Sequence, residues 1–194
     1  MLSVEAKSML KILITAENFI PNESELLQKS LNLGINYIHI RKPQATTQDV
    51  EALIKTLPPL IYPQLCIHYF PQLAIKYQLG GIHLNSRNTE ISANFQGRIS
   101  YSTHSFEELE SLWNKIDYAF LSPIYNSISK QGYQSKFSNK DLQKHQHLLN
   151  KAIALGGIRP ECQQELAQMG FAGMAYLGYV WKNINQFTNG HIKF

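Results

Sequence analysis

Hydrophobic and polar positions along the chain alternate between two kinds of segment. Short apolar runs of about four to eight residues, rich in Ile, Val, Tyr and Leu and bordered by turn residues, are typical of buried parallel strands. Eight such runs are expected to form strands: residues 11–16, 35–42, 64–70, 81–85, 98–104, 118–123, 151–157 and 173–178.

Amphipathic segments with helix start and stop signals separate these runs. Asn22 is the expected N-cap of the first helix, with Glu25 completing a capping box and Gly34 marking the end. Thr47 and Ser105 are expected to cap two later helices. Further helices are expected at residues 71–79, 138–150, 160–169 and 179–187, whereas residues 86–96 are too polar for a helix.

The alternation of eight strands with helices in 194 residues predicts an α/β protein, a compact (β/α)8 TIM barrel that forms one domain over residues 1–194. The competing architecture is an open, doubly wound sheet, which usually carries a glycine-rich turn after its first strand. The first expected strand runs instead into TAENFIPN, which contains no glycine. The barrel is therefore the favoured fold.

Composition narrows the class of protein. Hydrophobic residues make up 44% of the chain and charged residues 16%, so a packed core can form. Polar residues interrupt every apolar run before it reaches the roughly 18 residues of a membrane span, and the N-terminal segment is too short and too charged for a signal peptide. Cys66 and Cys162 are too few for a disulfide framework, so we expect reduced thiols in a cytoplasmic protein without a membrane partner.

The net charge of +4 and the isoelectric point near 9 permit nucleic-acid binding, but the basic residues are dispersed. Arg41 and Lys42 form the only adjacent basic pair, which favours phosphate on a small molecule over a nucleic acid. The chain has only three aspartates, so a magnesium site made from paired aspartates is hard to build.

In a TIM barrel, the side chains that act on a ligand lie where strands end and the following loops begin. His39 and Arg41 are two residues apart on one expected strand, so both are expected to face the interior at the barrel mouth. A buried guanidinium needs an anion, and its planar set of donors suits phosphate or carboxylate. We therefore expect Arg41 to bind the ligand, with pairing to a glutamate of the barrel as the structural alternative.

Three further segments at expected strand ends indicate a phosphorylated ligand. The loop after the sixth strand offers two hydroxyls and an ammonium group that can hold a diphosphate, from Ser127, Ser129 and Lys130. The pair Gly156–Gly157 ends the seventh strand, and Leu177–Gly178 ends the eighth. Barrels often bind phosphate at these two positions through backbone N–H groups.

Four histidines, His39, His68, His83 and His104, also fall at expected strand ends. A metal-dependent hydrolase barrel would carry a His-x-His motif on its first strand, and this chain has no histidine there. Each of the four is therefore expected to fill the core or to form hydrogen bonds. No metal-ligating residue is predicted.

The segments IHIRKP, GIHLNSRN, SYSTHSFEEL, DYAFLSPIYNSISKQGY, ALGGI and GFAGMAYLG resemble, in this order, those of the thiamine phosphate synthase and thiazole tautomerase superfamily. The resemblance runs from about residue 11 to residue 178, and the loop after the sixth strand and the ALGGI segment are its most specific parts. It implies a transferase of thiamine biosynthesis that joins hydroxymethylpyrimidine diphosphate to a thiazole phosphate and releases diphosphate.

The resemblance also implies roles for individual residues. Arg41 and the loop after the sixth strand would hold the diphosphate, Ser102 would lie beside the reacting groups, and the glycines at the last two strand ends would hold the thiazole phosphate. We predict a catalytic set of Arg41, Ser102, Lys130 and His39. We predict a substrate-binding set of Ser127, Ser129, Gly156, Gly157, Leu177, Gly178, His68 and His104.

The sequence departs from the family pattern at several of these positions. His39 stands where the family has Gln. The family lysine two residues after the arginine is Pro43 here, and Lys42 is the candidate substitute for it. At the end of the third strand, where the family has an Asn-Asp pair, this chain has His68 and Tyr69. Asn88 stands where the family has a second aspartate. The resemblance implies Mg²⁺ as a cofactor, but both carboxylates that bind it in the family are missing here. Glu90 is the nearest acidic residue.

Two alternatives to a synthase stay open on the sequence. A thiazole tautomerase needs a group of near-neutral pKa, and His39, His68 or His104 would have to replace the histidine of that branch, which aligns with Pro123. The second alternative is a barrel without catalysis that binds thiazole phosphate or thiamine phosphate. The expected partners are small phosphorylated pyrimidine and thiazole molecules, with a homodimer as the expected assembly.

Overall fold

The computed structural model describes residues 9–89, 91, 94–126 and 135–194, and the (β/α)8 barrel is confirmed. All strands are parallel and pair in chain order, and β8 closes onto β1. The strands are β1 (Leu10–Ile14), β2 (Tyr37–Ile40), β3 (Leu65–His68), β4 (Gly81–Leu84), β5 (Arg98–Thr103), β6 (Tyr118–Leu121), β7 (Ala152–Ala154) and β8 (Gly173–Tyr176). Each overlaps its predicted run, although the runs extend past the strand ends into the loops.

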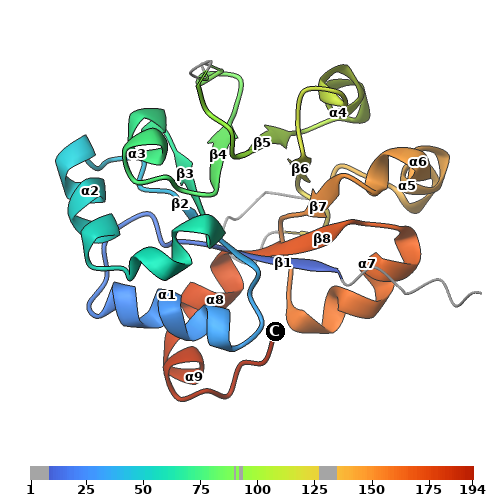
Figure 1. The fold of residues 1–194 in the computed structure, drawn as a ribbon. Helices are drawn as coiled ribbons and strands as arrows, with labels where there is room; N and C mark the ends of the chain where they lie inside the picture. The colour runs from blue at the N-terminus through green and yellow to red at the C-terminus, as the bar shows by residue number, and fades with distance from the viewer. Residues whose placement is uncertain (1–8, 90, 92–93, 127–134) are drawn as a thin grey trace, which may run out of the picture.

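Helices surround the strands on the outside of the barrel (Figure 1). They are α1 (Glu23–Asn32), α2 (Thr47–Lys55), η1 (Pro59–Gln64), α3 (Pro71–Lys76), α4 (Phe106–Leu112), α5 (Asn139–Lys144), α6 (Gln146–Leu149), η2 (Pro160–Cys162), α7 (Gln163–Met169), α8 (Gly178–Lys182) and α9 (Ile184–Thr188). Each of the last three predicted helices is divided into two shorter ones. Within the described part of the chain, no helix combines the length and the apolar character needed to cross a membrane.

The helix caps correct two predictions and agree with a third. Asn22 precedes α1 in a left-handed conformation (φ 55°) and its side chain makes no capping hydrogen bond, because capping requires an extended backbone at that position. Thr46, and not Thr47, caps α2 and forms a capping box with Asp49. Ser105 caps α4 by accepting a hydrogen bond from the backbone N–H of Glu108.

Two apolar layers hold the barrel together. The larger layer lies between the strands and the helices, and the smaller one fills one side of the barrel interior with Ile12, Ile14, Tyr118, Phe120, Ile153 and Ala175. The other side of the interior is polar, with buried side chains from β2 to β5: His39, Cys66, His68, His83 and Ser100. Cys66 and Cys162 are both free thiols, as predicted.

Candidate active site

A cavity of about 450 Å³ opens where the strands end and their following loops begin. Three residues of the smaller apolar layer inside the barrel, Ile14, Phe120 and Ala175, form part of the cavity wall. Eight residues predicted for the site line this cavity: Arg41, His68, Ser102, His104, Gly156, Gly157, Leu177 and Gly178. His39 lies fully buried inside the barrel and does not line the cavity. The roles predicted for these residues stay predictions, but the fold does bring them to one place.

Arg41 follows β2 and its guanidinium reaches the cavity, where Nη1 donates to Glu17 Oε1 at 2.6 Å. The side chain is 26% exposed, so the expectation of a buried arginine is wrong. Thr15 fixes the backbone at this point, because its hydroxyl accepts from the Arg41 N–H and donates to the Arg41 carbonyl. The structural alternative, a pair with a barrel glutamate, is present, and the exposed pair can still open to an anion because exposed ion pairs are weak.

Lys42 points the opposite way and is fully buried against the loop after β1 and α1. Its ammonium donates to both carboxylate oxygens of Glu23, at 2.6 and 2.9 Å, and to the carbonyls of Ala16 and Asn18. Burial lowers the pKa of Lys42 and raises the pKa of Glu23, each opposed by its partner. Lys42 therefore holds α1 and the loop after β1 in place, and the prediction that it substitutes for the family lysine after the arginine is wrong.

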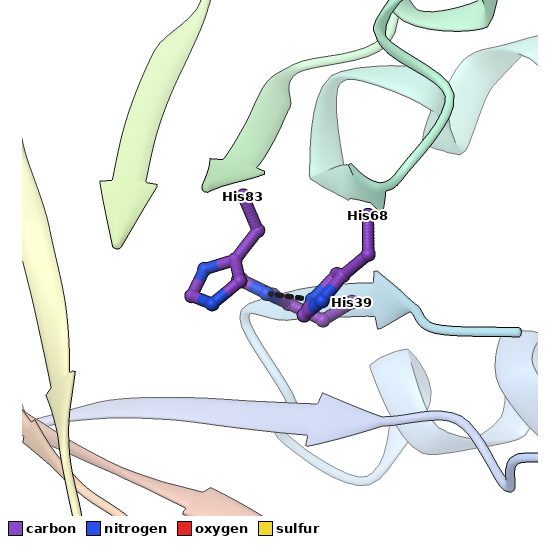
Figure 2. A group of neighbouring side chains, drawn as sticks. All are labelled: His39, His68 and His83. Carbon is purple, nitrogen blue, oxygen red and sulfur yellow. Dashed lines mark hydrogen bonds between the residues drawn. The ribbon is translucent and has the colours of Figure 1, made fainter. Parts of the chain in front are cut away.

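Three of the four predicted histidines form a cluster inside the barrel, which we call the histidine cluster: His39, His68 and His83 (Figure 2). His39 Nδ1 and His68 Nε2 share a hydrogen bond of 3.1 Å, and His39 Nε2 lies 2.7 Å from the hydroxyl of Tyr118. Burial lowers the pKa of all three imidazoles, that of His83 to about 3, so each is neutral near pH 7.

A chain of hydrogen bonds connects Ser102 at the cavity to the barrel interior. Ser102 Oγ lies 2.8 Å from His83 Nε2, and His83 Nδ1 lies 2.8 Å from Ser100 Oγ. The hydroxyl of Ser100 also donates to the carbonyl of Ile82 at 3.3 Å. These contacts hold the Ser102 side chain in one orientation at the cavity wall.

His104 is separate from the histidine cluster, although it lines the same cavity. Its Nδ1 lies 3.0 Å from the carbonyl of Ser122 and 3.3 Å from the hydroxyl of the same residue. Its backbone N–H donates to the carboxylate of Glu108 in the first turn of α4. His104 is thus positioned by the ends of β5 and β6.

The backbone at the ends of β7 and β8 forms the wall predicted to hold phosphate. Gly156 and Gly157 have φ angles of +95° and +69°, which favour glycine. Gly178 begins α8, whose first N–H groups have no partner within the helix. Trp181 fixes this helix to the barrel, since its indole N–H donates to the carbonyl of Ile14 at 2.8 Å.

The donors at the expected magnesium positions do not fit Mg²⁺. His68 ends β3 and Tyr69 follows it, both line the cavity, and Asn88 lies in the turn after β4. An imidazole, a phenol and an amide supply no negative charge near neutral pH, and magnesium favours carboxylate and water oxygens. Among the described residues that line the cavity, Glu17 is the single carboxylate, and it pairs with Arg41.

Four residues discussed from the sequence lie outside the described residues: Ser127, Ser129, Lys130 and Glu90. The cavity-lining residues that sequence reasoning did not assign to the site include Tyr69, Arg87 and Glu17, the partner of Arg41. Arg87 follows β4 by three residues, in a turn where its N–H donates to Asn85 Oδ1. A basic residue just after a strand end was the available signal for Arg87.

Comparisons with known proteins agree with this arrangement. The chain is 28% identical over 171 residues to a thiamine-phosphate synthase of Proteus mirabilis, covering 81% of this chain and 79% of that protein. The crystal structure of a thiamine phosphate pyrophosphorylase from Bacteroides thetaiotaomicron is similar, with a TM-score of 0.79, 29% identity and coverage of 90% and 85% of the two chains. A thiamine phosphate pyrophosphorylase from Pyrococcus furiosus, 19% identical over 94% of this chain and 92% of that chain with a TM-score of 0.74, has the same fold.

The family model described as thiamine monophosphate synthase matches residues 12–180, from the first strand to the start of α8. This match begins within β1, and it includes the other seven strands and every described residue predicted for the site. Because it covers most of the chain, the resemblance inferred from the strand-end motifs is confirmed. The chain belongs to the thiamine monophosphate synthase family.

Proposed function

We propose that this chain is a thiamine phosphate synthase, a transferase that joins hydroxymethylpyrimidine diphosphate to a thiazole phosphate and releases diphosphate. The observation that carries the proposal is one cavity that contains Arg41, Ser102 and the backbone of the last two strand ends. Its volume of about 450 Å³ suits two small ligands in contact. The family membership of the chain supports the same reaction.

Each side of the cavity has a distinct chemical task in this proposal. The thiazole phosphate would lie against the backbone of Gly156, Gly157 and Gly178, where N–H groups suit an anion. The diphosphate would lie against Arg41, with Ser127, Ser129 and Lys130 completing its site. As the bond to diphosphate breaks, negative charge grows on the leaving oxygens, and a guanidinium placed there lowers the barrier.

Magnesium enters this proposal only as an ion carried by the diphosphate. The residues at the family's carboxylate positions do not fit Mg²⁺, so no step of the reaction is assigned to a magnesium ion held by this chain. The free protein is expected to bind Mg²⁺ weakly. Activity should depend on magnesium through the substrate complex or not at all.

The tautomerase alternative is the weaker one. It needs an acid or base of near-neutral pKa in contact with substrate. Burial instead lowers the pKa of His39 and His68, two of the three candidate histidines, and the nearby cation of Arg41 adds to this effect at His68.

A cytoplasmic location and a homodimer stay predictions.

Turnover of the two substrates tests the proposal. The purified protein should form thiamine phosphate and diphosphate in equal amounts, and Arg41→Ala should reduce the rate without changing the fold. A folded protein that forms no product but isomerises a thiazole carboxylate phosphate would establish the tautomerase instead. Binding of thiamine phosphate without either reaction would establish the non-catalytic alternative.

A further inference from the structure

The histidine cluster has the side-chain composition of a transition-metal site. Its members come from three consecutive strands, β2, β3 and β4, and the register places His68 directly opposite His83. The three residues are between 0% and 5% exposed, and one nitrogen from each lies within 4.8 Å of the other two. Figure 2 shows the three rings gathered in one space inside the barrel.

The spacing of the rings is close to that of three imidazoles on one ion. With metal–nitrogen distances of about 2.1 Å and tetrahedral angles, ring centroids lie about 5 Å apart and ligating nitrogens about 3.4 Å apart. The centroid distances are 5.3 Å from His39 to His68, 5.2 Å from His39 to His83 and 4.2 Å from His68 to His83. His39 Nδ1 and His68 Nε2 are already 3.1 Å apart.

His83 is the member that must move. Both of its nitrogens are hydrogen-bonded to serine hydroxyls, of Ser100 and Ser102. A half-turn of the imidazole about its Cβ–Cγ bond exchanges Nδ1 with Cδ2 and Nε2 with Cε1. This rotation brings a ring nitrogen toward the other two histidines. The serine hydroxyls can rotate to follow the remaining N–H of His83, as hydrogen-bond partners of metal-bound histidines do.

The protonation of the cluster suits a metal ion as well. Neutral imidazole is the ligating form, and burial keeps all three rings neutral. An ion between His39 Nδ1 and His68 Nε2 would take the place of the shared proton, which moves to the other nitrogen of the donor ring. The hydroxyl of Tyr118, 2.7 Å from His39 Nε2, would then orient His39 from behind.

One side of the cluster is accessible from the cavity. His68 lines the cavity, as does Ser102, the hydrogen-bond partner of His83. Three protein nitrogens with an open fourth position is the arrangement of a catalytic zinc site, in which water or a ligand oxygen completes the tetrahedron. Imidazole donors select Zn²⁺, Co²⁺, Ni²⁺ or Cu²⁺ over Mg²⁺.

We propose that His39, His68 and His83 bind one divalent transition-metal ion, such as Zn²⁺, with its fourth position toward the cavity. The proposal replaces the sequence-based expectation of no metal ligands. It is independent of the proposed function, because the ion can bind whether or not thiamine phosphate is formed. The donor set also differs in kind from the missing magnesium carboxylates.

Titration of metal-free full-length protein with Co²⁺, followed by absorption spectroscopy, tests this proposal. Wild type should bind one ion and develop the visible bands of a tetrahedral site. His39→Gln and His68→Gln should each weaken binding by more than about 100-fold, and Tyr118→Phe by roughly 10–100-fold, the cost of losing an outer hydrogen-bond partner. His104→Gln, which removes a histidine of the same cavity outside the cluster, should bind as wild type does.

Folding of each variant is checked by circular dichroism, and X-ray absorption of the Zn²⁺-loaded wild type gives an answer that needs no variant. Three imidazole ligands on the zinc are expected. Absence of stoichiometric binding by wild type, fewer than three imidazoles, or unchanged affinity in folded His39→Gln would overturn the proposal. In that case the histidine cluster is a hydrogen-bonded core network only.

Discussion

Arg41 and Lys42 are adjacent cations with opposite environments, and the difference arises from strand geometry. Successive side chains at a strand end point to opposite faces, so Arg41 faces the cavity while Lys42 faces α1. The sequence shows two neighbouring charges but cannot show that Glu23, on a different element, lies where it can neutralise one of them. Only the residue facing the cavity is available to a ligand.

Removal of Arg41 should therefore affect binding and not folding. A charge-assisted hydrogen bond contributes about 1.5–3 kcal/mol, so Arg41→Ala should raise the Kd for inorganic diphosphate by about 10- to 100-fold. The thermal midpoint should stay near the wild-type value, because the Arg41–Glu17 pair is exposed. Calorimetric titration measures the Kd. Lys55→Ala, which removes an exposed charge on α2, is the control, and equal affinity in the Arg41 and Lys55 variants would exclude Arg41 from the site.

Removal of Lys42 should instead affect the stability of the fold and not ligand binding. Lys42→Met leaves the Glu23 carboxylate buried without its partner, and breaking a buried pair from one side costs about 3–5 kcal/mol. Urea denaturation should show this loss of unfolding free energy. The double variant Lys42→Met/Glu23→Leu should recover most of it, because no buried charge remains. A loss in the double variant as large as in the single one would contradict the assigned role of the pair.

At the scale of elements, the loops after the strands carry conformations that their sequence only partly indicates. The pattern of apolar runs predicts every strand, but it runs on beyond β7 into Gly156 and Gly157, which have positive φ. A Cβ on Gly157 would lie 2.6 Å from the carbonyl oxygen of Asn126 and 2.7 Å from Cβ of Tyr125. A side chain there therefore collides with the loop after β6 before it could displace an anion.

Gly157→Ala should accordingly disturb the contact between the loops after β6 and β7. It should lower the free energy of unfolding by about 1–3 kcal/mol, from positive φ and close contact together. Gly34→Ala is the matched control, since its φ is +103° and its nearest atom is 3.7 Å away. It should lose only about 1 kcal/mol. Chemical denaturation compares the two. A smaller loss at Gly157 than at Gly34 would show that the loop after β6 yields easily.

At the scale of the whole molecule, the sequence predicts the barrel and eight of the residues that line the cavity, because strand ends of a closed parallel barrel must meet at one mouth. The sequence does not predict the polar side of the barrel interior, where His39 forms a hydrogen bond with Tyr118 from the opposite side of the barrel. Contacts of this kind depend on register between distant strands. The pairing of Arg41 with Glu17 was open because the sequence does not show which side chain of the loop after β1 reaches the end of the neighbouring strand β2.

A crystal structure with thiamine phosphate and diphosphate bound tests the assignment of the cavity most directly. The phosphate of thiamine phosphate should lie within hydrogen-bond distance of the backbone N–H groups of Gly157 or Gly178, and the diphosphate should contact Arg41 after its separation from Glu17. Both ligands outside the cavity, or a diphosphate remote from an Arg41 still paired with Glu17, would contradict the assignment.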